Sequence, residues 1–265
     1  MKIAIIGCGA MGEAILKGWL TESISKSDIL VVEKVQERSQ YLQDTYQVPV
    51  VDQIELVGNS DVVLISVKPQ DIKLALNQLG KVIKAEALVI SIAVGVTTKF
   101  IQQELATANP VVRAMPNTPA LVGRSTTGLT AAASCDSSQL ALAKDLLSAV
   151  GTCVVVAEDQ IDVVAAVSGS GPAYFFWLVE NLTKAAIELG LDKETTNLIV
   201  RETFIGSAIL LDHSSDSAAA LRAKVTSPNG TTQAAISTIE QNEVAADWLL
   251  ALKAAIQRAQ ELQEG

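Results

Sequence analysis

The chain has 265 residues, 49% of them apolar, and a formal net charge of -9. This length and composition predict a globular protein with one large domain or two. The acidic charge, without a clustered basic stripe, argues against nucleic acid and anionic membranes as partners and favours a small-molecule substrate.

The first predicted elements form a strand, a glycine turn and a helix. A β-branched run, residues 2–6, precedes the turn Gly7-Cys8-Gly9-Ala10-Met11-Gly12, and residues 13–20 have helical spacing. In this context the glycines allow a tight turn, close approach of the backbone to a pyrophosphate, and close packing of helix on strand. A second apolar strand, residues 29–32, follows. The pattern therefore favours a dinucleotide site over a merely structural turn.

Charged side chains after the second strand bear on the choice of coenzyme. Glu33 ends the strand about twenty residues past the glycine turn, where an acid commonly accepts hydrogen bonds from the ribose hydroxyls, and this favours NAD. Lys34 and Arg38 follow and are suited to a 2′-phosphate if Glu33 turns aside. A solvated helix start explains the two basic residues equally well, so NAD(H) and NADP(H) both stay open.

Further apolar runs predict the other strands of a mainly parallel sheet. They are residues 61–67, 87–93, 111–115, 125–132 and 152–156, with a helix at 137–150 between the last two. Ligands collect beyond the carboxyl ends of such strands, so we expect Val67, Lys68 and Pro69 to line the coenzyme cleft. The prolines beside Asn117 predict a rigid loop that holds this side chain toward the nicotinamide amide, although asparagine in a turn is mostly a structural signal.

The second half of the chain is predicted to be helical. The pattern changes near residues 157–159, which we interpret as the boundary between a Rossmann NAD(P)-binding domain, 1–158, and an all-helical dimerisation and substrate-binding domain, 159–265. The predicted helices are residues 172–189, 193–211, 217–224, 231–240 and 243–261, and Ser168-Gly169-Ser170-Gly171 interrupts the helical pattern at their start. Residues 174–179 are apolar on nearly every side, so we expect a partner subunit to cover them.

A tight turn, Val225-Thr226-Ser227-Pro228-Asn229-Gly230-Thr231-Thr232, leads into one of these helices. Asn229 and Gly230 tolerate positive φ, and Thr231 or Thr232 is suited to cap the helix. The first backbone N–H groups of a helix have no internal partner, and the helix dipole makes that end mildly positive, so a small carboxylate or phosphate fits there. An ordinary capped helix is the alternative interpretation.

Cysteine and histidine usage narrows the class of site. The cysteines are odd in number and lack paired metal-type spacing, as is usual in a reducing compartment, so we expect a cytoplasmic protein. The single histidine, His213, excludes histidine triads and argues against a histidine-containing metal site, and we expect no metal. Residues 3–6 are too short for the apolar part of a signal peptide, and we expect no apolar run to approach bilayer length.

The motifs of both halves resemble those of the pyrroline-5-carboxylate reductases, in the same order along the chain. The matching stretches are the glycine turn, Val67-Lys68-Pro69-Gln70, Ser91-Ile92-Ala93-Val94-Gly95-Val96-Thr97, Arg113-Ala114-Met115-Pro116-Asn117-Thr118-Pro119-Ala120, Ser168-Gly169-Ser170-Gly171-Pro172-Ala173-Tyr174, and residues 225–232. The resemblance implies a Rossmann domain followed by a helical dimerisation domain like the C-terminal domain of 6-phosphogluconate dehydrogenase. It also implies NAD(P)H-dependent reduction of a cyclic imine to L-proline, and a homodimer with a decamer as the candidate larger assembly.

Family roles follow residue by residue from this resemblance. The residues that match the coenzyme site are Ile6, Gly7, Gly9, Ala10, Met11, Ser66, Val67, Lys68, Pro69, Ala93 and Asn117, to which Glu33 and Lys34 are added from their position. The residues that match the loop around the substrate carboxylate are Ser227, Gly230, Thr231 and Thr232. Thr232 matches the residue closest to the imine nitrogen, and we predict that it is catalytic. The chain departs from the family at Asn229, where glycine is usual, and Glu33 is usually absent from relatives that prefer NADPH.

Two other functions compete with this interpretation. A β-hydroxyacid dehydrogenase would need a lysine in the first interdomain helix, and residues 168–179 contain none. A sensor that binds NAD(P) without turnover would not require the second anion-binding turn. An assay that follows coenzyme oxidation with pyrroline-5-carboxylate separates these alternatives.

Overall fold

The structure, a computed structural model, describes residues 1–264. The chain forms two compact units. The first consists of residues 1–170 together with the end of the chain from Ala255, and the second consists of residues 171–254. The division falls at Ser170 and not at the sequence boundary at residue 158, because the polypeptide between these two positions packs with the sheet.

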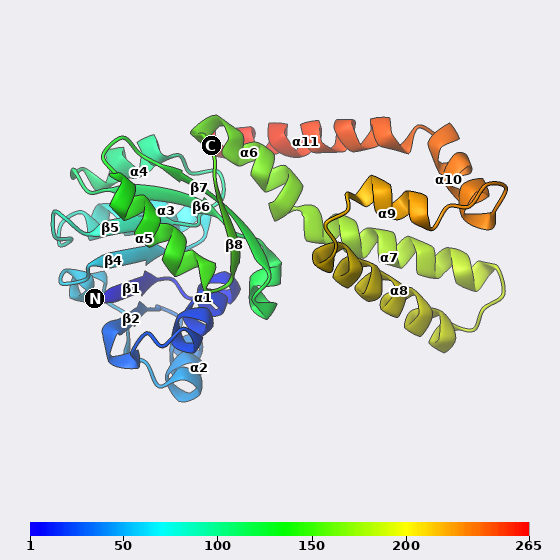
Figure 1. The fold of residues 1–265 in the computed structure, drawn as a ribbon. Coiled ribbons are helices and arrows are strands. Elements are labelled where there is room, and N and C mark those ends of the chain that lie inside the picture. Colours follow the sequence, from blue (N-terminus) through cyan, green and yellow to red (C-terminus); the bar gives the residue numbers. More distant parts are fainter. Residues whose placement is uncertain (265) are drawn as a thin grey trace. The chain divides into compact units, whose positions relative to one another are not determined.

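Within residues 1–264, one sheet of eight strands forms the centre of the first unit, in the order β3-β2-β1-β4-β5-β6-β7-β8 (Figure 1). The strands are β1 (Ile3–Ile6), β2 (Ile29–Val32), β3 (Val50–Val51), β4 (Val62–Ile65), β5 (Leu88–Ser91), β6 (Val111–Met115), β7 (Ser125–Ala131) and β8 (Gly151–Val155). All neighbouring pairs are parallel except β6 and β7. The strand order reverses its direction at β1 and β4, and the crevice at such a switch point is where open α/β sheets bind ligands.

Helices cover both faces of this sheet (Figure 1). They are α1 (Ala10–Thr21), α2 (Gln36–Tyr46), α3 (Pro69–Leu79), α4 (Thr98–Leu105) and α5 (Ser137–Ser148). Side chains of a strand alternate between its faces, so neighbours such as Ile5 and Ile6 belong to separate buried clusters. One cluster packs the sheet against α1 and α5, and the other packs it against α3 and α4. The Rossmann architecture predicted from the sequence is therefore confirmed.

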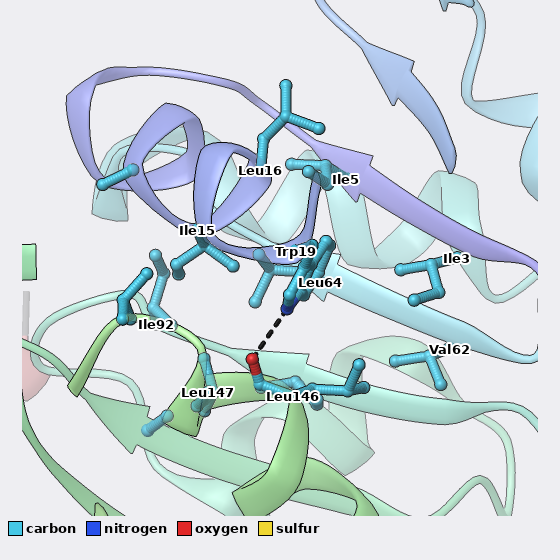
Figure 2. Packing of buried hydrophobic residues seen from close by; sticks show 14 of the residues in the cluster. Ile3, Ile5, Ile15, Leu16, Trp19, Val62, Leu64, Ile92, Leu146 and Leu147 are labelled. Carbon is cyan, nitrogen blue, oxygen red and sulfur yellow. Dashed lines mark hydrogen bonds between the residues drawn. The ribbon is translucent and has the colours of Figure 1, made fainter. Parts of the chain in front are cut away.

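Trp19 ties the helix after the glycine turn to the rest of the first cluster. Its ring is fully buried beside Ile15 and Leu64, and its Nε1 donates a hydrogen bond to the carbonyl oxygen of Leu146 at 2.7 Å (Figure 2). A buried indole N–H needs such a partner, because an unpaired donor in the core is costly. The packing of α1 against α5 and the sheet holds the glycine turn in place.

The second half is helical, as predicted. Its helices are α6 (Ile161–Val164), α7 (Gly171–Glu188), α8 (Lys193–His213), α9 (Ala218–Lys224), α10 (Thr231–Gln241) and α11 (Val244–Glu264). The predicted interruption near Ser168 is a π-helical turn over Ala165–Gly169 inside a helical run from Glu158 to Glu188. A single π-helical turn within an α-helix marks an inserted residue, and such turns are frequent at functional sites.

The run Glu158–Glu188 is, by length and composition alone, apolar enough to cross a bilayer. The expectation that no apolar run approaches bilayer length is therefore wrong for this segment. Only 17% of its most apolar window is buried within the single chain. The core helix of a protein that never enters a membrane passes the same test. Length and apolar composition alone therefore do not assign this segment to a membrane.

Candidate functional site

A cleft of about 490 Å³ lies at the carboxyl ends of β1, β2 and β4. The first part of its wall is the glycine turn from Ile6 to Gly9, and the second is the segment after β2 that contains Glu33, Lys34 and Arg38. Residues 66–68 after β4, the first turns of α3 and Ile54 complete the wall. The cleft is thus at the switch point of the sheet, where a dinucleotide is expected.

The three glycines of the turn have different surroundings, which test whether a pyrophosphate fits. Gly7 has a φ of +78°, and a Cβ there would lie 2.7 Å from Cγ1 of Val67. A Cβ on Gly12 would lie 2.9 Å from Oγ of Ser66, whereas a Cβ on Gly9 would meet nothing within 4 Å. Gly7 therefore makes the turn, Gly12 lets the helix approach the strand, and Gly9 leaves open space in front of the helix.

Helix α1 begins at Ala10 with Gly9 as its N-cap, and no side chain caps it among the described residues. Its first N–H groups consequently remain available to an anion, and the helix dipole favours negative charge at this end. The open space beside Gly9 lies at the same place. The residues present fit the pyrophosphate of a dinucleotide, as in other glycine turns that precede a helix.

Glu33 is fixed at the rim of the cleft by the backbone. Its Oε2 accepts a hydrogen bond from the N–H of Cys8 at 3.1 Å, and its Oε1 accepts one from the N–H of Val35 at 3.0 Å. A carboxylate has about four lone-pair sites, so acceptor capacity remains for ribose hydroxyl groups. Lys34 also lines the cleft and is exposed.

Arg38 contacts the glycine turn and α1. Its Nε donates to the carbonyl oxygen of Cys8 at 2.8 Å, and its Nη2 lies 2.5 Å from Oε2 of Glu13. The hydroxyl groups of Tyr41 and Tyr46 donate to the other oxygen of Glu13, at 2.9 Å and 2.6 Å. Burial raises the pKa of Glu13, but these hydrogen bonds from Tyr46, Arg38 and Tyr41 outweigh it, and the pKa of Glu13 is lowered overall.

The structure brings most of the predicted coenzyme residues to one cleft. Those that line it are Ile6, Gly7, Gly9, Glu33, Lys34, Ser66, Val67 and Lys68. Those that do not line it are Ala10, Met11, Pro69, Ala93 and Asn117. Ala10 and Pro69 are the first residues of α1 and α3, and Ala93 is buried just beyond β5.

Asn117 lies in a dense set of hydrogen bonds. Its Nδ2 donates to the carbonyl oxygen of Ser168 at 3.0 Å and to Oγ of Ser168 at 3.1 Å. Its Oδ1 accepts from the N–H of Thr126 at 3.0 Å. Both amide protons are therefore used within the protein, and Oδ1 keeps one free lone pair.

Sequence reasoning missed several residues around the cleft. Gln70, Asp71, Leu74 and Ala75 line it from one face of α3, a helix that the sequence analysis did not assign. The signal for them was Pro69, because proline is favoured in the first turn of a helix, and the spacing of the four residues matches one helix face. No local signal pointed to Glu13, since its contact with Arg38 joins residues that are 25 positions apart.

The predicted substrate turn lies in the second unit and leads into α10. Asn229 has a φ of +59°, as its residue type indicates, whereas Gly230 has a φ of -84°. A Cβ on Gly230 would lie 2.5 Å from Oγ of Ser227, so a larger residue there would displace that side chain. The N–H of Asn229 donates to Oε1 of Gln233 at 2.6 Å, and the N–H of Gly230 donates to the carbonyl oxygen of Ser227 at 3.0 Å.

The prediction that Thr231 or Thr232 caps this helix is wrong. Gly230 is the N-cap, so both threonines are already inside the first turn, and within residues 1–264 no side chain caps α10. A glycine cap has no side-chain oxygen to accept from the first N–H groups. The helix start is thus left open to an anion, with Thr232 half-buried beside it and Thr231 exposed.

Two family models match the chain in succession. A model described as an NADP oxidoreductase, coenzyme F420-dependent, matches residues 2–95. A model of the pyrroline-5-carboxylate reductase dimerisation domain matches residues 158–262. The first match covers the glycine turn and the cleft, and the second covers the helical half with the substrate turn.

Relatives match over nearly the whole length. The pyrroline-5-carboxylate reductase of Pseudomonas aeruginosa is 40% identical over 265 residues, which cover 99% of this chain and 97% of the relative. That of Mycobacterium leprae is 38% identical over 262 residues, which cover 91% and 89%. A solved pyrroline-5-carboxylate reductase from Coxiella burnetii is 39% identical, with a TM-score of 0.94 over 98% of each chain.

A more distant structure has the same fold. The pyrroline carboxylate reductase of Plasmodium falciparum, solved with NADP bound, is 24% identical, with a TM-score of 0.86 over 99% of this chain and 98% of that one. The closer relatives decide the family, because their identity is higher and extends through both compact units. The chain belongs to the pyrroline-5-carboxylate reductase family.

Proposed function

We propose that this chain reduces 1-pyrroline-5-carboxylate to L-proline with NAD(P)H, the last step of proline biosynthesis. The observation that carries the proposal is the 40% identity to the Pseudomonas aeruginosa reductase across 99% of the chain. The dinucleotide cleft and the open helix start at the substrate turn agree with it, since the reaction needs one site for a coenzyme and one for a small acid.

The coenzyme role falls to the residues around the cleft. We propose that the open start of α1, with Gly9, Ala10 and Met11, holds the pyrophosphate, and that Glu33 and Lys34 face the adenosine ribose. The other coenzyme residues are proposed to follow the dinucleotide: Ile6, Gly7, Ser66, Val67, Lys68, Pro69, Ala93 and Asn117. The amide protons of Asn117 hold Ser168, so its proposed role is to fix the loop at the nicotinamide end, with the remaining lone pair of Oδ1 facing the coenzyme.

The substrate role falls to the turn before α10. We propose that the first N–H groups of α10, at Thr231 and Thr232, hold the substrate carboxylate, while Ser227 and Gly230 shape the turn around it. The hydroxyl group of Thr232 is then placed to hydrogen-bond the ring nitrogen. The helix dipole adds a favourable interaction with the carboxylate that does not depend on a charged side chain.

The reaction does not require a strong acid or base from the protein. When bound, the reduced nicotinamide supplies a hydride to the imine carbon, and with a proton on the ring nitrogen the product is the secondary amine L-proline. A protonated cyclic imine already has an electron-poor carbon, so the protein's contribution is to orient the substrate and to keep its nitrogen hydrogen-bonded. This agrees with a chain that has one histidine.

We also propose a homodimer, with a decamer as the larger assembly, and a functional boundary at residues 158 and 159. The match of residues 158–262 to a dimerisation model supports the dimer and the boundary. Within the second unit, α7 and α8 expose large apolar side chains, among them Phe176, Trp177 and Leu198, as expected for a surface that a partner subunit covers. Three unpaired cysteines are consistent with work in the cytoplasm.

A steady-state assay tests the proposed function. Purified protein is mixed with 1-pyrroline-5-carboxylate and either NADH or NADPH, and coenzyme oxidation and proline formation are both measured. We expect one proline for each coenzyme oxidised. If neither coenzyme is oxidised, while the Pseudomonas aeruginosa relative is active in the same buffer, the proposal is overturned. A β-hydroxyacid offered together with NAD+ or NADP+ is expected to give no reduction of the coenzyme.

A further inference from the structure

The choice between NADH and NADPH depends on the residues near the adenosine ribose. The two coenzymes differ only in a phosphate on the ribose 2′ oxygen, which carries negative charge and needs cationic donors. A free 2′ hydroxyl group instead suits a carboxylate acceptor. The cleft offers both kinds of residue after β2, namely the acid Glu33 and the bases Lys34 and Arg38.

Arg38 uses its Nε and Nη2 donors within the protein. The guanidinium has five N–H donors, one of them at Nε and two at Nη2. Nε donates to the carbonyl oxygen of Cys8 at 2.8 Å, and Nη2 donates to Oε2 of Glu13 at 2.5 Å and to the carbonyl oxygen of Gly9 at 3.4 Å. The guanidinium carbon also lies 5.0 Å from the centre of the Tyr41 ring. Arg38 is therefore held toward α1 and the glycine turn.

Glu13 is itself held firmly, so its pairing with Arg38 is not a loose surface contact. Its side chain is 19% exposed and that of Arg38 is 27% exposed. Tyr41 and Tyr46 donate to one oxygen of Glu13 while Arg38 binds the other. A carboxylate that accepts from three donors neutralises the guanidinium at short range and restricts its rotation. The guanidinium therefore binds a second anion less well.

Glu33 stands on the opposite side of the same backbone segment. The N–H of Cys8 donates to Glu33, whereas the carbonyl oxygen of Cys8 accepts from Arg38. A second backbone donor, the N–H of Val35, holds the other oxygen of Glu33. The negative carboxylate is thus fixed at the rim of the cleft, where it is suited to a ribose hydroxyl group and repels a 2′-phosphate.

We propose, on the basis of the function proposed above, that Glu13 is a positioning residue for coenzyme choice. By binding Arg38, Glu13 withholds the guanidinium from the 2′ position and leaves Glu33 to receive the ribose, so the chain binds NADH more tightly than NADPH. Glu13 does this from the first turn of α1, without touching the ribose itself.

Equilibrium binding tests the proposal without turnover. Dissociation constants of NADH and NADPH are measured for the full chain from the fluorescence of the reduced nicotinamide. We expect NADH to bind more than about threefold tighter, as unfavourable charge at the 2′ position would cause. A smaller ratio, or a preference for NADPH, overturns the inference and leaves the reductase function standing. Failure of both coenzymes to bind overturns both proposals.

Substitution of Glu13 tests the mechanism. Glu13→Gln releases Arg38, so we expect the NADPH dissociation constant to fall about three- to tenfold, as one gained charge-assisted contact allows, with the NADH constant changed less than about twofold. The double variant with Arg38→Gln is expected to lose this gain, because the effect requires Arg38. An unchanged ratio of the two constants in Glu13→Gln overturns the assignment.

Two further variants separate this role from a structural one. Glu37→Gln removes the same charge from an exposed position beside Arg38 and is expected to leave the ratio unchanged. If it shifts the ratio as much as Glu13→Gln, the effect is general charge and the assignment fails. Arg38→Gln alone is expected to change NADPH binding less than about twofold. A loss of about tenfold would mean that Arg38 already binds the 2′-phosphate, and this also overturns the proposal without requiring a folded Glu13 variant.

Discussion

The side-chain amide of Asn117 donates two hydrogen bonds to Ser168, one to the carbonyl oxygen of Ser168 at 3.0 Å and one to its Oγ at 3.1 Å. The two residues are 51 positions apart, one in the loop after β6 and the other in the π-helical turn. Thr126 closes the set, because its N–H donates to Asn117 and its carbonyl oxygen accepts from Oγ of Ser168. The loop, β7 and the π-helical turn therefore hold one another in place.

Asn117→Asp is expected to destabilise the protein by about 2 to 3 kcal/mol, because a carboxylate has no proton for the carbonyl oxygen of Ser168 and sets negative charge against it. The free energy of unfolding in denaturant measures this. Asn242→Asp is the matched control, since the Asn242 amide makes one exposed contact with a helix carbonyl. Equal losses in the two variants would contradict the structural role of Asn117.

Thr232→Ala is expected to lower turnover about ten- to a thousandfold, the range for one lost hydrogen bond at a reacting group. Steady-state kinetics with saturating substrate give the result. Thr238→Ala, a change of the same kind at an exposed position on the same helix, is expected to behave as the unaltered protein does. Normal turnover in Thr232→Ala would remove its assigned role.

Asn229→Ala is expected to cost about 1 kcal/mol, because alanine is strained at the φ of +59° that Asn229 adopts. Asn229→Gly is expected to be tolerated, since glycine adopts that conformation without strain and keeps the backbone hydrogen bond to Gln233. Thermal unfolding compares the three proteins. An alanine variant as stable as the glycine variant would show that the turn relaxes to another conformation.

Arg113→Met is expected to destabilise the first unit by about 3 to 5 kcal/mol, because it leaves Glu158 and Asp162 without the cation between them. Arg113 is 4% exposed at its side chain and lies 3.0 Å from each carboxylate. Arg258→Met removes an exposed ion pair and is expected to cost less than about 1 kcal/mol. Denaturant unfolding separates the two, and similar losses would rule out the buried network as a source of stability.

Glu13→Gln is expected to make the free energy of unfolding less dependent on pH in the acidic range. The pKa of Glu13 is lowered in the folded state, so its contribution is complete above the unfolded value of 4.5 and is lost as pH falls through the lower folded value. The variant should be less stable than the unaltered protein at pH 7, on the order of 1 kcal/mol after solvent screening. The gap should narrow as pH falls below 4.5 and close once pH has passed the lower folded pKa. Unfolding curves across this pH range measure the gap, and a gap that widens in acid would contradict the assignment.

Local sequence patterns were sufficient for much of the fold and for locating the two candidate binding sites. The strand before the glycine turn, the positive φ at Asn229 and the helix that follows residue 230 all depend on neighbouring residues, whose conformational preferences are readable from the chain. The short strand Val50–Val51 was missed because two residues give no periodic signal.

Tertiary structure alone decided which distant residues meet. The antiparallel pairing of β6 with β7, the indole of Trp19 at the carbonyl oxygen of Leu146, and the attachment of Arg38 to Glu13 all join segments that the sequence pattern treats as independent. Hydrophobic spacing reports which side of a segment is buried, but it does not report the partner, because burial is not directional and many apolar faces would serve. The cap at Gly230 and the contact between Arg38 and Glu13 depend on atoms placed within a few ångströms of one another, and only the folded chain sets such distances.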